Sequence, residues 1–296
     1  MKVKFKILIL LFITVMTNSN YTNAQLRLGV FADCQYCECE PMGSRFYRSS
    51  PQKLDECIER FNREKNLAFV VGLGDLIDRN FSSFDTLQHI LNLSVHDTYN
   101  IPGNHDFEVE KEKLANVPDA LGLDKTYYTV EKDNWLFIFL NGNEITFNSP
   151  NPETVKKAGK MLAELKAAGK PNDYEWNGGM SKKQVNWLEK QLKTAQNKNQ
   201  NVALLCHYPL LPFEAHALWN SEEVLEVLKK YDNVKLWLNG HNHKGNYTYQ
   251  HDIHFLTHQA MVETENENAF SIFTFSEEKI EVEGFGREPD RKLMIE

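Results

Sequence analysis

The organisation of this chain follows from one apolar run that ends on a glycine and an acid, Phe69-Val70-Val71-Gly72-Leu73-Gly74-Asp75. Its length and composition are typical of a buried strand. A second run, from Leu26 to Ala32, ends on Asp33 in the same way. Because ligands of open α/β sheets gather at the carboxyl ends of the strands, we expect Asp33 and Asp75 to lie close together at one edge.

Four further short motifs continue this pattern. They are Asp33-x-Gln35, Gly103-Asn104-His105-Asp106, Cys206-His207-Tyr208-Pro209 and Gly240-His241-Asn242-His243. Carboxylate, amide oxygen and imidazole bind hard or borderline divalent cations, and two such cations about 3.5–4 Å apart need a shared carboxylate. The motifs therefore predict a two-metal site with Asp75 as the bridge. One cation would be held by Asp33, Gln35, Asp75 and His243, and the other by Asp75, Asn104, His207 and His241.

Strands and helices alternate through most of the chain, which predicts the α/β class. Further strands are expected at Val95–Asn100, Trp135–Leu140, Val202–Cys206 and Val234–Leu238. Helices with apolar residues at helical spacing are expected to follow N-cap serines, namely Ser50, Ser181 and Ser221.

Two segments depart from this alternation. Residues 147–180 contain three prolines around a Lys-rich helix, and we interpret this segment as an insertion near the rim of the site. After His243 the apolar residues recur with period two. This pattern predicts an antiparallel meander that forms a second sheet packed on the first.

The five motifs resemble those of the calcineurin-like metallophosphoesterase superfamily, which are Asp-x-His, Gly-Asp, Gly-Asn-His, His and Gly-His-x-His. The resemblance implies a four-layer α/β/β/α sandwich of two packed mixed sheets flanked by helices, formed by one domain over residues 25–296. It also implies in-line attack of a water on one phosphorus, with both cations neutralising charge on the phosphoryl oxygens.

Gln35 departs from the superfamily pattern, which usually has histidine there. An amide oxygen is a weaker and harder donor than imidazole, so the first site should favour Mn²⁺, with Mg²⁺ possible, over Zn²⁺. The Asp-x-Gln motif resembles that of the manganese-dependent ADP-ribose/CDP-alcohol diphosphatases. Further stretches that are similar to this subfamily are Gly43–Arg48, Trp176–Gly179, His207–Leu210, Leu218–Asn220 and Gly284–Arg291.

The subfamily resemblance implies hydrolysis of the diphosphate bond in a nucleoside diphosphate linked to an alcohol or sugar. Substrates of the ADP-ribose or CDP-choline type would give a nucleoside monophosphate and a phosphorylated alcohol or sugar. A cyclic-nucleotide or general phosphodiesterase with the same metals is one alternative. A non-catalytic scaffold that binds a protein is another, although every metal-ligand position is filled here.

His105 is not counted among the ligands. Its place beside Asn104 suits a general acid that protonates the leaving oxygen. Either Asp78 or Asp106 would then orient its imidazole. A leaving phosphate departs readily, so this proton should matter less for a diphosphate than for an alkyl phosphodiester.

Two pairs of side chains are candidates for substrate contacts. Arg45 and Arg48 would bind phosphate oxygens through bidentate hydrogen bonds, with a solvated surface position as the alternative. Phe213 and Trp219 would stack on a nucleobase, although aromatic residues near a loop also complete a hydrophobic core.

Residues 1–24 have the pattern of a secretory signal peptide. Lys2, Lys4 and Lys6 precede an apolar run from Ile7 to Met16, which is about half of the roughly 20 residues that a spanning helix needs. We therefore expect export to the periplasm or the exterior without stable membrane insertion after cleavage. An uncleaved leader that attaches the protein to a membrane is the alternative.

The net charge and the cysteine content limit which partners the chain is expected to bind and how its cysteines can pair. The 296-residue chain has a formal net charge of −8, which disfavours general binding of nucleic acid. The expected partner is a small nucleotide, and no protein partner is implied. The five cysteines are an odd number, so at least one is unpaired within the chain. Cys57 and Cys206 are expected in the core, and Cys34 is expected to point away from the metal ligands.

Overall fold

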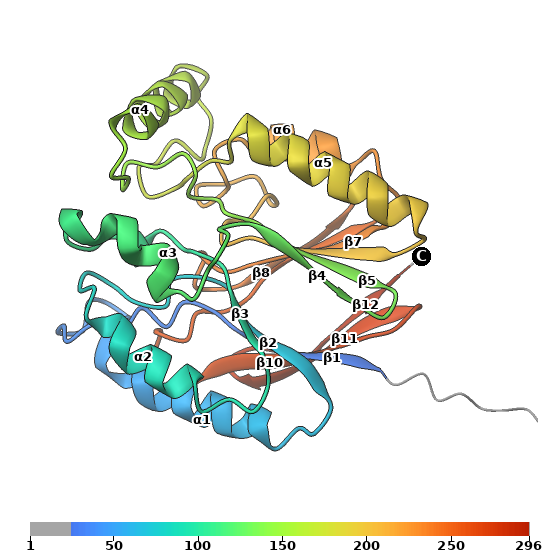
Figure 1. Ribbon diagram of the computed structural model, residues 1–296, viewed down its shortest axis with the longest axis horizontal. Helices are drawn as coiled ribbons and strands as arrows, with labels where there is room; N and C mark the ends of the chain where they lie inside the picture. The colour runs from blue at the N-terminus through green and yellow to red at the C-terminus, as the bar shows by residue number, and fades with distance from the viewer. Residues whose placement is uncertain (1–24, 296) are drawn as a thin grey trace, which may run out of the picture.

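Two six-stranded mixed sheets pack against each other in the computed structural model, which describes residues 25–295 (Figure 1). The first sheet has the order β12 (Arg291–Met294), β11 (Lys279–Gly286), β10 (Ala269–Phe275), β1 (Leu26–Phe31), β2 (Leu67–Gly72) and β3 (Thr98–Asn100). The second has the order β4 (Tyr128–Lys132), β5 (Trp135–Phe139), β6 (Asn201–Leu205), β7 (Val234–Asn239), β9 (Ile253–Thr257) and β8 (Asn246–Gln250). The predicted signal peptide lies outside the described residues.

Helices cover the outer face of each sheet, which confirms the predicted α/β/β/α sandwich. On the first sheet lie α1 (Ser50–Asn62) and α2 (Ser83–Leu91), and on the second lie α5 (Lys182–Asn197) and α6 (Ser221–Leu228). The other helices are α3 (Val117–Ala120), α4 (Pro152–Ala167) and the short 3₁₀ turns Tyr47–Ser49, His105–Phe107 and Lys111–Asn116. Within residues 25–295, no helix is both long and apolar enough to cross a bilayer.

A hydrophobic core between the sheets fixes the strands whose ends carry the predicted ligands. Val30 of β1 and Phe69 of β2 lie in this core with Phe137 of β5 and Leu238 of β7. The rings of Phe69 and Phe137 meet edge to face, with centroids 5.2 Å apart. Burying each side chain of this size contributes about 1.5–3 kcal/mol.

The predicted helix starts are correct for one of the three serines. Ser181 caps α5, since its hydroxyl accepts from the Gln184 N–H at 3.2 Å. Ser50 and Ser221 are instead the first helical residues, after Ser49 and Asn220. The buried Ser50 hydroxyl donates to the carbonyl of Cys34, so it is not available to cap the helix.

The C-terminal strands were predicted to form the second sheet together, and this pairing was wrong. Only β8 and β9 of this region join the second sheet, whereas β10, β11 and β12 extend the first sheet from β1. β10 pairs antiparallel with β1, with Arg27 opposite Thr274. A period-two pattern shows that a strand has one buried face but does not show which sheet receives it.

The segment interpreted as an insertion folds as α4 with irregular chain on both sides. In Figure 1, α4 lies at the upper left, outside the helix layers that cover the sheets. Ala158 and Leu162 of α4 are buried in a separate small cluster with Ile145 and Trp219. This segment therefore has its own packing and leads directly into the loop before α5.

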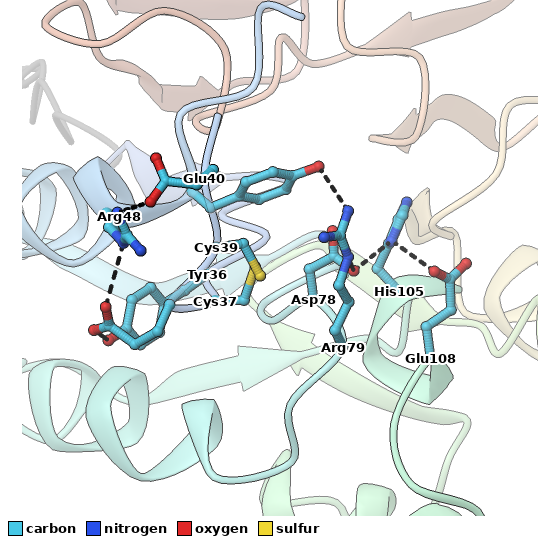
Figure 2. The surroundings of a disulfide bond; sticks show 11 residues. Tyr36, Cys37, Cys39, Glu40, Arg48, Asp78, Arg79, His105 and Glu108 are labelled. Carbon is cyan, nitrogen blue, oxygen red and sulfur yellow. Dashed lines mark hydrogen bonds and ion pairs between the residues drawn. A yellow bond between two sulfur atoms is a disulfide. The ribbon is translucent and has the colours of Figure 1, made fainter. Parts of the chain in front are cut away.

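The cysteines divide into a disulfide and three buried thiols. Cys37 and Cys39 form the disulfide in the loop after β1, and Figure 2 shows its surroundings. Cys57 and Cys206 are free and fully buried, as expected. The Cys34 sulfur lies 3.5 Å from the Met261 sulfur, and both side chains belong to the hydrophobic core beneath α1 and α2.

Candidate metal centre

The seven predicted metal ligands come together at the carboxyl ends of β1, β2, β6 and β7 and in the loop after β3. His207 Nε2 is central to one group, since it lies 3.2 Å from Asp75 Oδ2, 3.2 Å from Asn104 Oδ1 and 3.2 Å from His241 Nδ1. The remaining candidate ligands gather around Gln35. Its Nε2 lies 3.1 Å from Asp75 Oδ2 and 3.0 Å from His243 Nε2. His243 Nε2 in turn lies 3.8 Å from Asp33 Oδ1. Asp75 therefore lies between the two predicted groups.

The backbone is turned sharply at four of these ligands. Asp33, Gln35, Asp75 and His241 have φ values of 52°, 46°, 54° and 68°. This left-handed conformation costs about 1–3 kcal/mol for a residue with a side chain, and it persists where the surrounding structure enforces it. Here it turns the chain immediately after the strands and aims the side chains at one point.

Two motif glycines lie so close to neighbouring residues that a side chain would not fit. A Cβ at Gly103 would lie 2.1 Å from Asp75 Oδ1, which is far inside van der Waals contact. A Cβ at Gly74 would lie 2.7 Å from His207 Nδ1, and Gly74 also has a φ of +90°. The glycines in Gly-Asp and Gly-Asn-His thus make room for the bridging carboxylate and for a histidine.

Outer hydrogen bonds fix which nitrogen each histidine presents. His207 Nδ1 lies 2.8 Å from the Leu73 carbonyl, so it carries the proton and leaves Nε2 as the donor to a metal. His243 Nδ1 lies 2.7 Å from Glu263 Oε1, which leaves its Nε2 in the same way. The hydrogen bond from His243 above all lowers the pKa of Glu263 to about 2.

His241 has the opposite tautomer. Its Nε2 lies 2.9 Å from Asn177 Oδ1, so Nδ1 faces the other ligands. The orientation of the Asn177 amide is itself fixed, because Nδ2 donates to the carbonyls of Asn172 and Ala215 at 3.1 and 2.7 Å. All three histidines are therefore oriented with their second ring nitrogen toward the site, where it would bind a cation in its unprotonated form.

The donor set fits two divalent cations. Asp33 and Asp75 are completely buried, and burial above all raises the pKa of Asp33, so a cation would relieve the cost of its charge. Gln35 Oε1 is buried without a hydrogen-bond partner. Turning this amide by half a rotation about its last C–C bond would place Oε1 beside Asp75 and His243, where an oxygen donor is required.

His105 contacts two acids at the edge of this centre. Its Nδ1 lies 3.3 Å from Asp78 Oδ1 and 3.3 Å from Glu108 Oε2 (Figure 2). Asp106 does not contact the ring, because its carboxylate accepts the backbone N–H groups of residues 75, 76, 77 and 103 at 2.8–3.2 Å. Of the two predicted orienting residues, Asp78 is the one in position, and Asp106 ties the Gly-Asp loop to the Gly-Asn-His loop.

A cavity of about 300 Å³ opens over the centre. Its lining residues are Gln35, Arg45, Asp75, Asn104, His105, Glu108, Trp176, His216, His241 and His243. Arg45 thus faces the place where a phosphate would bind. Arg48 pairs instead with Glu40 at 2.8 Å (Figure 2). It also pairs with Glu38 at 3.5 Å and lies outside this lining.

Comparison with known proteins agrees with this geometry. The family model described as calcineurin-like phosphoesterase matches residues 26–245. The chain belongs to this family. A manganese-dependent ADP-ribose/CDP-alcohol diphosphatase of Arabidopsis thaliana is 30% identical over 267 residues, which cover 79% of this chain and 86% of the relative. The diphosphatase of the same description from Mus musculus is 25% identical, with coverage of 89% and 91%.

Solved structures show the same fold. A dimetal phosphatase from Danio rerio superposes with a TM-score of 0.81 at 24% identity, covering 92% of this chain and 99% of that one. GAP50 of Plasmodium, described as the anchor in the inner membrane complex, has a TM-score of 0.57 at 14% identity, with coverage of 92% and 89%. The complete donor set and the relatives identify this calcineurin-like phosphoesterase as a dimetal phosphohydrolase.

The two predicted stacking residues of this phosphoesterase lie outside the cavity lining. Trp219 is buried and packs edge to face on Phe147, with ring centroids 5.9 Å apart. Its indole N–H donates to the Tyr174 carbonyl at 3.0 Å. Phe213 is half-buried, with Lys170 Nζ 5.6 Å from its ring centroid. Trp219 therefore completes the small hydrophobic cluster beneath α4, which was the alternative to stacking on a nucleobase.

The sequence did not single out several residues that contact the phosphoesterase site. Glu108, Asn177 and Glu263 contact His105, His241 and His243, respectively, and Trp176 and His216 line the cavity. Trp176 and Asn177 belong to a motif noted for its resemblance to the diphosphatases, so a signal existed for them. Glu108 and Glu263 lie in stretches without a motif.

Proposed function

We propose that this enzyme hydrolyses the diphosphate bond of a nucleoside diphosphate linked to a small alcohol or sugar. ADP-ribose would give AMP and ribose 5-phosphate, and CDP-choline would give CMP and phosphocholine. The main support is the amide ligand Gln35 in the Asp-x-Gln motif, set in a centre of the calcineurin-like type. The names of relatives at 25–30% identity support the same substrate class.

Arg45 and Trp176 are the substrate contacts that the cavity supports best. Arg45 supplies a planar cation for the phosphate that is not attacked. Trp176 is 43% exposed and stacks on Tyr174, with ring centroids 4.1 Å apart, so its indole is already ordered at the cavity wall. An ordered aromatic face of this kind suits a planar base.

His105 would act as the general acid. The carboxylates of Asp78 and Glu108 each lie 3.3 Å from Nδ1, which leaves Nε2 to hold the proton that passes to the leaving oxygen. The His105 backbone N–H donates to Asp75 Oδ1 at 2.8 Å and so fixes the imidazole relative to the bridging carboxylate. Bound Mn²⁺ or Mg²⁺ would supply charge neutralisation at the phosphoryl oxygens and a water of lowered pKa.

Initial rates with Mn²⁺ test this substrate class against the phosphodiesterase alternative. The substrates are ADP-ribose, CDP-choline, cyclic AMP and bis-p-nitrophenyl phosphate, with Asp75→Ala as the control for metal-dependent turnover. Faster hydrolysis of the two diphosphates is expected. A preference for cyclic AMP or the synthetic diester would contradict the proposal while leaving the dimetal enzyme intact.

We also propose that the enzyme is exported. The pattern of residues 1–24 supports this, and so does the Cys37–Cys39 disulfide, because disulfides persist mainly in oxidising compartments. Expression of the full chain in a bacterial host, followed by fractionation and N-terminal sequencing, tests it. A product that begins at Gln25 outside the cytoplasm is expected, and an unprocessed cytoplasmic product would contradict export.

A further inference from the structure

We propose that Glu263 is a positioning residue that holds His243 for the first cation and so offsets the weak amide ligand Gln35. The proposal rests on the dimetal site used by the proposed function. It concerns how this chain retains its metal and does not depend on which nucleotide is hydrolysed.

The contact between Glu263 and His243 is short and shielded. Glu263 Oε1 lies 2.7 Å from His243 Nδ1, and the side chains are 15% and 11% exposed. On the other side of the ring, Nε2 lies 3.0 Å from Gln35 and 3.8 Å from Asp33. The carboxylate therefore contacts the ring on the side opposite the other candidate ligands, where it would fix both the tautomer and the ring orientation for a bound cation.

The backbone on both sides of Glu263 is itself anchored. Lys53 is buried, and its Nζ donates to the carbonyls of Met261 and Glu263 at 2.9 and 3.1 Å. Glu263 also forms a β-bridge with Arg45, and Thr264 N–H donates to the Ser44 carbonyl at 2.9 Å. Glu263 is thus held against the loop that carries Arg45, and its carboxylate has a fixed position from which to orient His243.

The partners of the three histidines differ in charge. His207 donates to the Leu73 carbonyl and His241 to the Asn177 amide oxygen, both of which are neutral. His243 donates to a carboxylate. A negatively charged acceptor makes the imidazole a stronger metal donor than a neutral acceptor does.

The carboxylate of Glu263 supports the group of ligands that has the weaker donor set. The first group consists of Asp33, Gln35, Asp75 and His243, with an amide at Gln35 in place of a second imidazole. His243 is therefore the one nitrogen donor among these four predicted ligands. Loss of such an outer partner typically lowers metal affinity 10–100-fold. The expected loss at Glu263 is therefore confined to one of the two cations.

Mn²⁺ binding to the chelator-stripped enzyme provides the test, by calorimetry and by electron paramagnetic resonance. The wild type should bind two equivalents. Glu263→Gln keeps an oxygen acceptor of the same size and removes the charge, so one equivalent should bind 10–100-fold more weakly while the other is unchanged. In activity assays, Glu263→Gln should need more Mn²⁺ than the wild type for half-maximal rate.

Glu214→Gln is the matched control. Glu214 Oε1 accepts from the amides of Asn242 and Asn246, at 3.3 and 3.4 Å, and so contacts the same loop without contacting a histidine of the centre. Glu214→Gln should bind both cations as the wild type does. Thermal unfolding of both metal-stripped variants identifies any loss that comes from misfolding.

Three outcomes would overturn the proposal: two unchanged sites in Glu263→Gln, equal weakening of both sites, or the same loss in Glu214→Gln. If Glu263→Gln does not fold, Glu263→Asp takes its place in the test, because it keeps the charge but has a shorter side chain that does not reach His243. Wild-type affinity in a folded Glu263→Asp would also contradict positioning. A wild-type protein that binds two Mn²⁺ but hydrolyses no diphosphate would refute the proposed function and leave this inference standing.

Discussion

Asn177 Oδ1 lies 2.9 Å from His241 Nε2, and this contact joins the loop before α5 to the second group of metal ligands. The loop is anchored in turn by Asn172, whose amide donates to the Leu218 carbonyl at 2.8 Å. The chain that follows α4 therefore supplies an outer wall of the metal centre.

Replacing Asn177 with alanine should weaken the second cation and spare the first. His241 would lose the acceptor that fixes its tautomer, so Mn²⁺ affinity at that site should fall about 10-fold or more. Calorimetric titration measures this loss. Equal weakening of both cation sites, or unchanged affinity at the second site, would contradict the role of the hydrogen bond.

Arg45 and Arg48 offer a matched pair of substitutions. Arg45 lines the cavity, whereas Arg48 pairs with Glu38 and Glu40 outside it. Hydrogen bonds to charged groups contribute about 1.5–3 kcal/mol, so Arg45→Ala should raise KM for a nucleotide substrate roughly 10- to 100-fold. Arg48→Ala should leave KM within about twofold, because an exposed ion pair contributes little. Equal effects in steady-state assays would argue against a phosphate contact at Arg45.

The loss on His105→Ala should depend on the leaving group. General acid catalysis contributes about 10²–10⁴-fold where the leaving oxygen needs a proton. An alkyl phosphodiester should therefore lose far more activity than CDP-choline, whose leaving phosphate departs readily. Comparison of kcat on the two substrates measures the difference, and the same loss on both would remove the assigned role.

Gln35→His should move the metal preference toward zinc. Imidazole is a softer donor than the amide oxygen it replaces, and it suits Zn²⁺ better. The ratio of activity with Zn²⁺ to activity with Mn²⁺ should rise relative to wild type in the reconstituted enzyme. A wild type that is most active with zinc would contradict the explanation for the amide.

The proximity of the candidate ligands could be predicted because each follows a strand. Asp33 and Asp75 end apolar runs, and parallel strands present their carboxyl ends at one edge, so their proximity follows from the pattern alone. His241 was recognisable through its neighbours in the Gly-His-x-His motif. The positive φ values and the glycine contacts then explain why these motifs tolerate little change.

The outer partners could not be predicted in this way. Glu263 reaches His243 because the segment between β9 and β10 returns to the end of β1, where the Val262 N–H donates to the Asp33 carbonyl at 3.0 Å. The pairing of β10 with β1 that follows was misassigned from a period-two pattern. Trp219 was a candidate for stacking because the sequence does not show that Phe147 packs against its ring. Long-range packing decides such contacts, whereas local motifs are enough to predict the candidate ligands.

Product analysis with CDP-choline tests the central claim most directly. The wild-type enzyme with Mn²⁺ should release CMP and phosphocholine in equal amounts, and Asp75→Ala or excess chelator should abolish both products. Release of inorganic phosphate or CDP, or no turnover of either CDP-choline or ADP-ribose under these conditions, would contradict the account.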